Sequence, residues 1–404
     1  MSFADLRTRV DQARVAGDGH ALAAALLALA EAEPLLGHRQ AAVRAPLEEA
    51  AGLLAEGAGL AEGAGPVAAS ALEGRVLLRL GHVKLSEGDL EGALQLAGRA
   101  CARLEPAGDV DRLVEADALI ARAAIRRHQF AQAHSRLVAA SERLDEPTTQ
   151  AGRRAVAGLA LAWAELALEQ QDYAGAESRL AELAGGLTDD ADDDDELVEA
   201  RFACQQARAA AALGQGDQAR ACHALRDAVG IAKRIGGLDD ELETRIALAG
   251  ALAQRGDQVG REEAERHLQI ARDQAVEHGR DSLHMAALVG HAGLLAQKGQ
   301  TQAALSRCIE IASSAVSKHD LVRYAAAVAL MSQIYEQKED LASAYRTFAE
   351  AHAALRDQLG DQATELFRPH ISALASRIGY QKFAEIAKQV NAAAHARQAF
   401  RRRS

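Results

Sequence analysis

Apolar residues along this chain recur mostly at helical spacing. From residue 72 onward, leucines and valines recur at helical spacing up to the break at Gly88. A second apolar stripe follows Asp89, which can cap a helix, and Pro106 blocks its continuation. The two stripes consist of Leu72, Val76, Leu77 and Leu80, and then of Leu90, Ala93, Leu94, Ala97 and Leu104. The pattern predicts two amphipathic helices joined by a turn.

This turn signal recurs at a nearly constant interval. It is a small or polar pair, often Gly-Asp or Gln-Asp, followed four residues later by an alanine. The alanines are Ala93, Ala133, Ala176, Ala221, Ala264, Ala304 and Ala344, with extra residues before Ala264. Their spacings are 40, 43, 45, 43, 40 and 40 residues, which indicates an array of helical hairpins. An alanine in the first turn of the second helix lets the two helices of a hairpin approach closely, since a larger side chain would separate them.

The units resemble the tetratricopeptide repeat (TPR). The matching residues are Leu80-Gly81 with Ala93 and Ala97, Trp163-Ala164, Tyr335 with Ala344 and Phe348, and the terminal prolines Pro106 and Pro147. Most aromatic positions of the family are aliphatic or alanine here, and the period is nearer 40 than 34, as in the longer TPR-like arrays of kinesin light chain and bacterial regulatory proteins. The resemblance implies an all-α fold, a right-handed α-α superhelix (TPR-like solenoid), and we expect a C-terminal capping helix pair.

Four segments are expected. Residues 1–64 form a divergent N-terminal helical hairpin plus a Gly-rich linker, and 65–358 form the array of about seven repeats. Residues 359–398 form the capping helices, because Phe367, Ile371, Leu374 and Ile378 make one apolar stripe. Residues 399–404 are a basic tail, and we expect the end of the chain from His395 to be mobile.

Composition and charge exclude several classes of protein. Alanine makes up nearly a quarter of the chain and β-branched runs are scarce, which argues against a sandwich, a barrel or a βαβ fold. The net charge of −11 disfavours nonspecific binding of nucleic acid by the whole protein. The sequence shows no apolar run long enough to span a membrane and no secretory signal, so a cytoplasmic, bacterial-type protein is predicted.

Candidate chemistry is sparse. The sequence contains no phosphate-binding loop, nucleophile elbow or zinc-protease motif, so no enzyme activity, cofactor or metal is expected. The four cysteines are expected to be small buried residues. His284 and His291, seven residues apart, are interpreted as partly exposed structural histidines. The acidic run 189–196 is predicted to be a solvated loop, with an electrostatic contact to a basic partner as the alternative.

The family binds its partners mainly through the inner helices that line the concave surface. In the resemblance, five basic residues fall on or near that surface: Arg75, Arg79, His82, Arg122 and Arg126. A patch of this kind could hold an acidic segment or a C-terminal carboxylate, and ordinary solvated arginines are the alternative. The function predicted is a non-catalytic scaffold or adaptor that binds a protein or peptide partner. The alternative is a ligand- or peptide-responsive regulator that acts through a separate effector chain.

Overall fold

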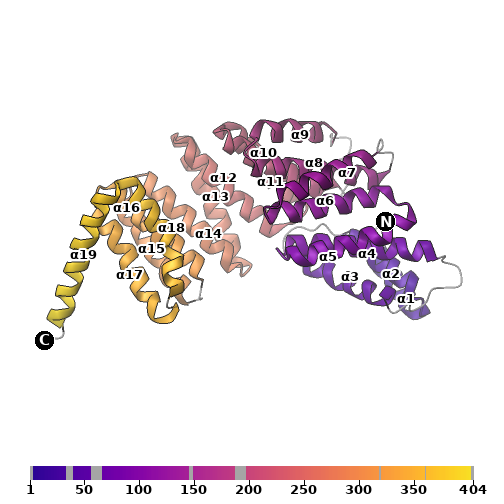
Figure 1. The fold of residues 1–404 in the computed structure, drawn as a ribbon, viewed down its shortest axis with the longest axis horizontal. Helices are drawn as coiled ribbons and strands as arrows, with labels where there is room; N and C mark the ends of the chain where they lie inside the picture. Colours follow the sequence, from indigo (N-terminus) through magenta and orange to yellow (C-terminus); the bar gives the residue numbers. More distant parts are fainter. Residues whose placement is uncertain are drawn as a thin grey trace. The chain divides into compact units, whose positions relative to one another are not determined.

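A computed structural model describes residues 3–32, 40–55, 66–144, 149–186, 197–317, 320–359 and 361–401. Within these ranges the elements are helices, and no strand is present (Figure 1). The helices are α1 (Phe3–Ala16), α2 (Gly19–Glu31), α3 (Gln40–Ala55), α4 (Pro66–Ser86), α5 (Leu90–Leu104), α6 (Val110–Arg126), α7 (Phe130–Arg143), α8 (Gln150–Glu169), α9 (Tyr173–Gly186), α10 (Val198–Gly214), α11 (Gln218–Arg234), α12 (Leu238–Arg255), α13 (Gln258–Glu277), α14 (Asp281–Gln297), α15 (Thr301–Ser317), α16 (Leu321–Gln337), α17 (Leu341–Leu359), α18 (Asp361–Ile378) and α19 (Tyr380–Arg401). The all-α prediction is confirmed.

The helices form two compact units, Met1–Arg255 and Gly256–Ser404. In the first unit, α2, α4, α6 and α8 each contact the next even-numbered helix, and all five helices from α2 to α10 in this series also pack against the odd-numbered helix that follows. In the second unit, α14, α16 and α18 follow one another in the same way. We call these even-numbered helices the inner helices. Those from α4 to α16 are the first helices of hairpins, as the periodicity predicts.

The recurring turn signal has a specific backbone conformation. One residue of each turn has a positive φ, and where the next residue is an aspartate its carboxylate caps the second helix. In the first turn of this kind, Gly88 has φ 81° and the Asp89 carboxylate accepts a hydrogen bond from the Gly92 amide at 2.9 Å. The equivalent cap at Asp217 accepts from the Arg220 amide at 3.0 Å. These turns end one helix and start the next without help from distant parts of the chain.

The recurring alanines lie where the two helices of a hairpin meet. All seven, from Ala93 to Ala344, have 0% exposure, which confirms the reason predicted for their small size. Helix α13 begins at Gln258, directly after the cap Asp257, so Ala264 comes three residues later than its counterparts do. The extra residues before Ala264 are therefore part of the helix. At Gly81 of the TPR-like pair, an added Cβ would lie 2.8 Å from Cδ2 of Leu119 on α6, so a larger residue would force the Leu119 side chain to shift.

The N-terminal helices belong to the first unit's core. Val10 of α1, Leu26 of α2 and Leu47 of α3 are buried in one cluster with Val76 and Leu80 of α4. The predicted linker residues 57–65 lie outside the described residues, as do Pro147 and the acidic run 189–196. The proposed segment limits are therefore still proposals.

The C-terminal helices cover the last hairpin. Phe367 and Leu374 of α18 are fully buried in the same cluster as Phe348 of α17, and Ile371 and Ile378 pack against it. On α19, Val390 is buried, whereas the opposite face, with Lys382, Glu385, Lys388 and Gln389, is exposed. The predicted capping pair is confirmed. Helix α19 continues through the expected tail to Arg401.

Candidate functional site

The five basic residues predicted for the partner surface lie on two neighbouring inner helices. Arg75, Arg79 and His82 belong to α4, and Arg122 and Arg126 belong to α6. Four of the five make ion pairs with carboxylates that lie far away in the sequence. The surface is therefore a network of alternating charges rather than a row of free cations.

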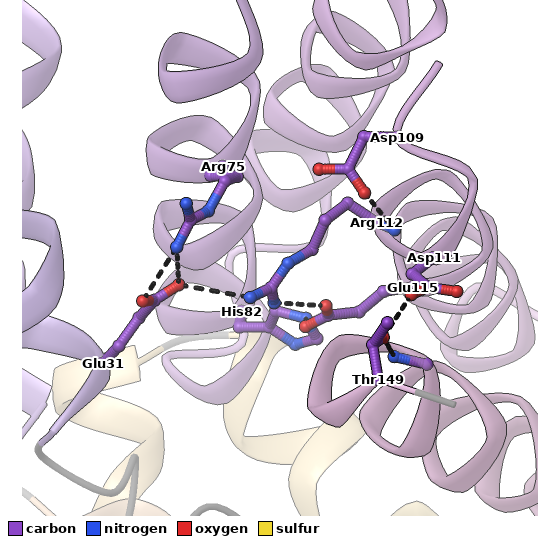
Figure 2. A network of polar contacts seen from close by, with 9 residues as sticks. Glu31, Arg75, His82, Asp109, Asp111, Arg112, Glu115 and Thr149 are labelled. Carbon is purple, nitrogen blue, oxygen red and sulfur yellow. Dashed lines mark hydrogen bonds and ion pairs between the residues drawn. The ribbon is translucent and has the colours of Figure 1, made fainter. Parts of the chain in front are cut away.

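Glu31 connects three helices at one edge of this network. Located at the end of α2, it accepts hydrogen bonds from Arg75 Nη2 of α4 at 3.1 and 3.2 Å (Figure 2). The same carboxylate lies 3.5 Å from Arg112 Nη2 of α6. A single glutamate thus neutralises arginines from two successive hairpins, which fixes the spacing of α2, α4 and α6.

Glu115 is the buried centre of the same network. His82 Nε2 lies 3.2 Å from Glu115 Oε1, and Arg112 Nη1 donates to Glu115 Oε2 at 2.8 Å (Figure 2). Burial alone would raise the pKa of Glu115, but the His82 hydrogen bond and the Arg112 charge outweigh it and hold that pKa well below its usual range. Glu115 therefore carries a charge at neutral pH, and His82 is used in holding it.

Arg122 and Arg79 pair with carboxylates of later inner helices. Arg122 makes a close contact with Glu165 of α8, with Nη2–Oε1 at 2.7 Å and Nε–Oε1 at 2.9 Å. Arg79 reaches further: its Nη2 lies 3.2 Å from Oε1 of Glu199 at the start of α10, 120 residues away. The Arg79–Glu199 pair therefore links inner helices that are three hairpins apart.

Arg126 differs from the other four predicted residues. Its Nη1 donates to the backbone carbonyl of Leu85, at the end of α4, at 2.9 Å. Within the described part of the chain, no carboxylate pairs with it. Burial and the nearby charge of Arg122 lower the pKa of Arg126, which is the direction expected where positive charge exceeds negative charge. The network therefore has its uncompensated positive charge at this end of α6.

The carboxylates of this network were not predicted from the sequence. Their sequence positions, Glu31, Glu115, Glu165 and Glu199, carry no motif. A weak signal did exist, because Glu115, Glu165 and Glu199 all lie on first helices of hairpins, on which inner-surface residues were expected. The separations of 33 to 120 residues between them and the predicted basic residues show why spacing along one helix could not find them.

The cysteines and the two histidines of α14 lie in buried or half-buried positions. Cys204, Cys222 and Cys308 are buried and Cys101 is half-buried, and burial raises the pKa of Cys101, Cys204 and Cys308 to about 11. His284 and His291 are both half-buried on α14, in agreement with the structural interpretation. Among the described residues, no three His, Cys, Asp or Glu side chains gather as a metal site. None of the described helices combines the length and apolar character that crossing a membrane requires.

Comparison with known proteins adds the fold. No protein-family model and no curated protein matches the sequence. Among solved structures, the chain is similar to a Signal Transduction ATPase with Numerous Domains that carries a tetratricopeptide repeat sensor, from Pyrococcus horikoshii. The two are 14% identical with a TM-score of 0.57, and the match covers 88% of this chain but 53% of the other. The chain thus spans about half the length of that protein.

Two further structures match with lower TM-scores. One is a Rap protein complexed with the Competence and Sporulation Factor, at 13% identity and TM-score 0.48, with 96% of this chain and 99% of the other covered. The second is the P58(IPK) TPR domain, at 17% identity and TM-score 0.21, with 85% and 94% covered.

Two observations identify the fold: the stacked hairpins and the similarity to the Pyrococcus horikoshii structure. Successive hairpins of about 40 residues place their first helices side by side, with a buried alanine where each pair meets. The archaeal structure with the TPR sensor shares this arrangement over most of the present chain. The protein is therefore a TPR-like helical repeat protein with an all-α solenoid fold.

Proposed function

We propose that the protein is a non-catalytic interaction protein that binds a segment of a protein or peptide partner on the inner helices of its first unit. The observation that carries this proposal is the position of Arg126. It lies on the inner face beside Arg122, has no carboxylate partner among the described residues, and already donates to a backbone carbonyl. A guanidinium in this setting gains from a ligand carboxylate, which can accept its remaining N–H groups.

The partner segment proposed is acidic. The contacts of the other arginines support this, because each already pairs with a glutamate side chain, and a ligand glutamate, aspartate or terminal carboxylate offers the same chemistry. Two of these glutamates, Glu165 and Glu199, come from α8 and α10. An extended acidic segment would replace such contacts with its own, so binding is electrostatic and weakens with salt.

A binding measurement with a defined probe tests this proposal. Fluorescence anisotropy of a fluorescein-labelled octaglutamate peptide should show saturable binding that weakens several-fold between about 0.05 M and about 0.5 M NaCl. Arg126→Gln should weaken binding by about three- to tenfold. The matched control is Arg103→Gln, which removes the same charge from α5, where Arg103 pairs with Glu73 at 2.9 Å. Equal losses in the two variants would show that only the total charge matters.

A second function, a ligand-responsive regulator, is favoured by the Arg79–Glu199 contact. An ion pair between helices three hairpins apart depends on the curvature of the array, so a ligand that changes the curvature would break it. The similar archaeal protein carries a TPR segment named as a sensor, and here the effector would be a separate chain. Hydrogen exchange of α4 and α10 with and without a bound peptide tests this: protection that stays unchanged in both helices favours the scaffold.

A further inference from the structure

Glu199 differs in its position from the other charged residues of the inner helices. It lies in the first turn of α10, two residues after Leu197, the N-cap residue, which makes no side-chain cap bond. Its carboxylate lies on Arg79 of α4, across three hairpins, at 3.2 Å. Its charge also helps to raise the pKa of Arg122, after the larger effect of Glu165. One carboxylate from α10 thus acts on two of the arginines that a partner carboxylate would seek.

The Glu199 carboxylate can be replaced on Arg79 by the carboxylate of a ligand. Arg79 is 15% exposed and Glu199 is 31% exposed, so water reaches both side chains. Arg79 Nη2 lies 3.2 Å from Glu199 Oε1, whereas the distances between Arg122 and Glu165 are shorter, between 2.7 and 3.1 Å. Ion pairs that water reaches contribute little to the stability of the folded state. A ligand carboxylate can therefore take the place of Glu199 at little cost.

Repulsion on the other side of Glu199 also favours its release. Asp240 of α12 lies near it, with Asp239 and Glu243 close by on the same helix. Burial raises the pKa of Asp240 to about 6, and the charges of Glu243, Asp239 and Glu199 add to the rise. The Asp240 Oδ2 atom is buried and has no hydrogen-bond partner among the described residues. When Glu199 moves away, this acidic cluster loses one source of repulsion.

We infer that Glu199 is a built-in competitor of the partner: in the free protein its carboxylate occupies Arg79, and an acidic ligand segment binds by displacing it. This inference rests on the proposed function, because it concerns the same inner face. It makes the affinity of the surface for acidic segments depend on a residue that would not itself touch the ligand. It also gives the first unit a contact that binding would break, between helices α4 and α10.

The octaglutamate probe and four variants test the competition. Glu199→Gln should bind the probe about three- to tenfold more tightly than the wild type, since it can no longer compete for Arg79. Arg79→Gln should bind it more weakly. In the double variant, the gain from Glu199→Gln should disappear, because the arginine for which Glu199 and the ligand compete is gone. Glu49→Gln is the matched control: it removes the same charge from α3, where Glu49 pairs with Arg14 at 2.6 Å, and should leave the affinity unchanged.

The outcomes separate this inference from the proposed function. If the wild type and Glu199→Gln bind the probe equally, the competition is refuted and the acidic-ligand surface stands. If Glu199→Gln still tightens binding when Arg79 is absent, or if Glu49→Gln tightens it as much, the effect is general repulsion and the competition is again refuted. If no variant binds the probe, the acidic-ligand function fails and the competition fails with it. Circular dichroism melts of all variants identify any that do not fold.

Discussion

The seven turns of the array differ in the type of residue that adopts the positive φ. Glycine occupies it at four turns, and other residues occupy it at three, namely His128, Gln171 and Glu339, with φ of 59°, 62° and 61°. A side chain in this left-handed conformation brings Cβ too close to the backbone, which costs roughly 1–2 kcal/mol. This conformational cost is present at the three turns without glycine and absent at the other four.

Replacing these residues with glycine should therefore stabilise the array. Gln171→Gly and Glu339→Gly should each raise the free energy of unfolding by about 0.5–1 kcal/mol, after the greater freedom of glycine in the unfolded chain is subtracted. His128→Gly should gain less, since the His128 ring packs edge-on against Phe130 at 5.8 Å. Thermal melts measure the effect. Gly299→Ala is the reverse control and should lower the melting temperature; a gain there would contradict the explanation.

Asp240 gives a second prediction at the residue scale, in its pH dependence. Because its pKa is raised to about 6 in the folded protein, the folded state holds this proton more tightly than the unfolded chain does. Ionisation of Asp240 therefore destabilises the folded protein. The effect grows as the pH rises from the pKa of Asp240 in the unfolded chain to about 6, and it is complete above that pH. Asp240→Asn should raise the melting temperature at pH 8 and bring almost no gain near pH 4.

The control for this effect is an aspartate of the neighbouring helix. Asp227→Asn changes the exposed Asp227 of α11, which lies 3.2 Å from His223, and should show no gain at pH 8. A gain from Asp240→Asn that is equal at pH 4 and pH 8 would mean that it arises from packing and not from the charge.

At the scale of the element, the C-terminal helices behave as a cap. Helix α18 buries Phe367 and Leu374 against α16 and α17, and the Phe348 and Phe367 rings lie 6.2 Å apart. Helix α19 adds Phe383, which packs edge-on against Tyr345 at 5.3 Å. The last hairpin thus has a cover on the side where an array would otherwise end with exposed apolar groups.

Two truncations and one substitution test the cap. A chain that stops at Gly360 should melt at a much lower temperature or aggregate, because Phe348 and its neighbours lose their cover. A chain that stops at Val390 should melt nearly as the full chain does, since it keeps every buried apolar side chain among those whose burial the structure describes. Phe367→Ala should cost about 3–5 kcal/mol, as expected for a large side chain removed from a core. If both truncations melt alike, α18 does not cap the array.

At the scale of the whole molecule, the fold depends on signals that lie close together in the sequence, whereas the candidate site joins residues that lie far apart in it. Each hairpin is specified by a turn, a cap and an alanine within a few residues, so the periodicity predicted the elements and even the irregular spacing before Ala264. The arginines of the site could be placed on their helices in the same way. Their partners could not, because Glu31, Glu165 and Glu199 meet them only after several hairpins have stacked.

The helical content of the intact chain is a direct check at this scale. Far-ultraviolet circular dichroism should give a helical fraction more than twice the roughly one third that is average for globular domains. The expectation follows from the helices that fill nearly all of the described ranges. A clear β contribution to the spectrum would contradict the hairpin array.

The buried thiols have a practical consequence for spectroscopy of this protein. Thiolates rather than thiols react with maleimides, and a pKa of about 11 leaves Cys101, Cys204 and Cys308 almost entirely protonated at neutral pH. A cysteine introduced at an exposed site would have a pKa nearer the ordinary value of about 8.5 and react roughly a hundredfold faster. Cys222 is fully buried. Dyes or spin labels could therefore be attached at chosen surface positions while the native cysteines stay in place.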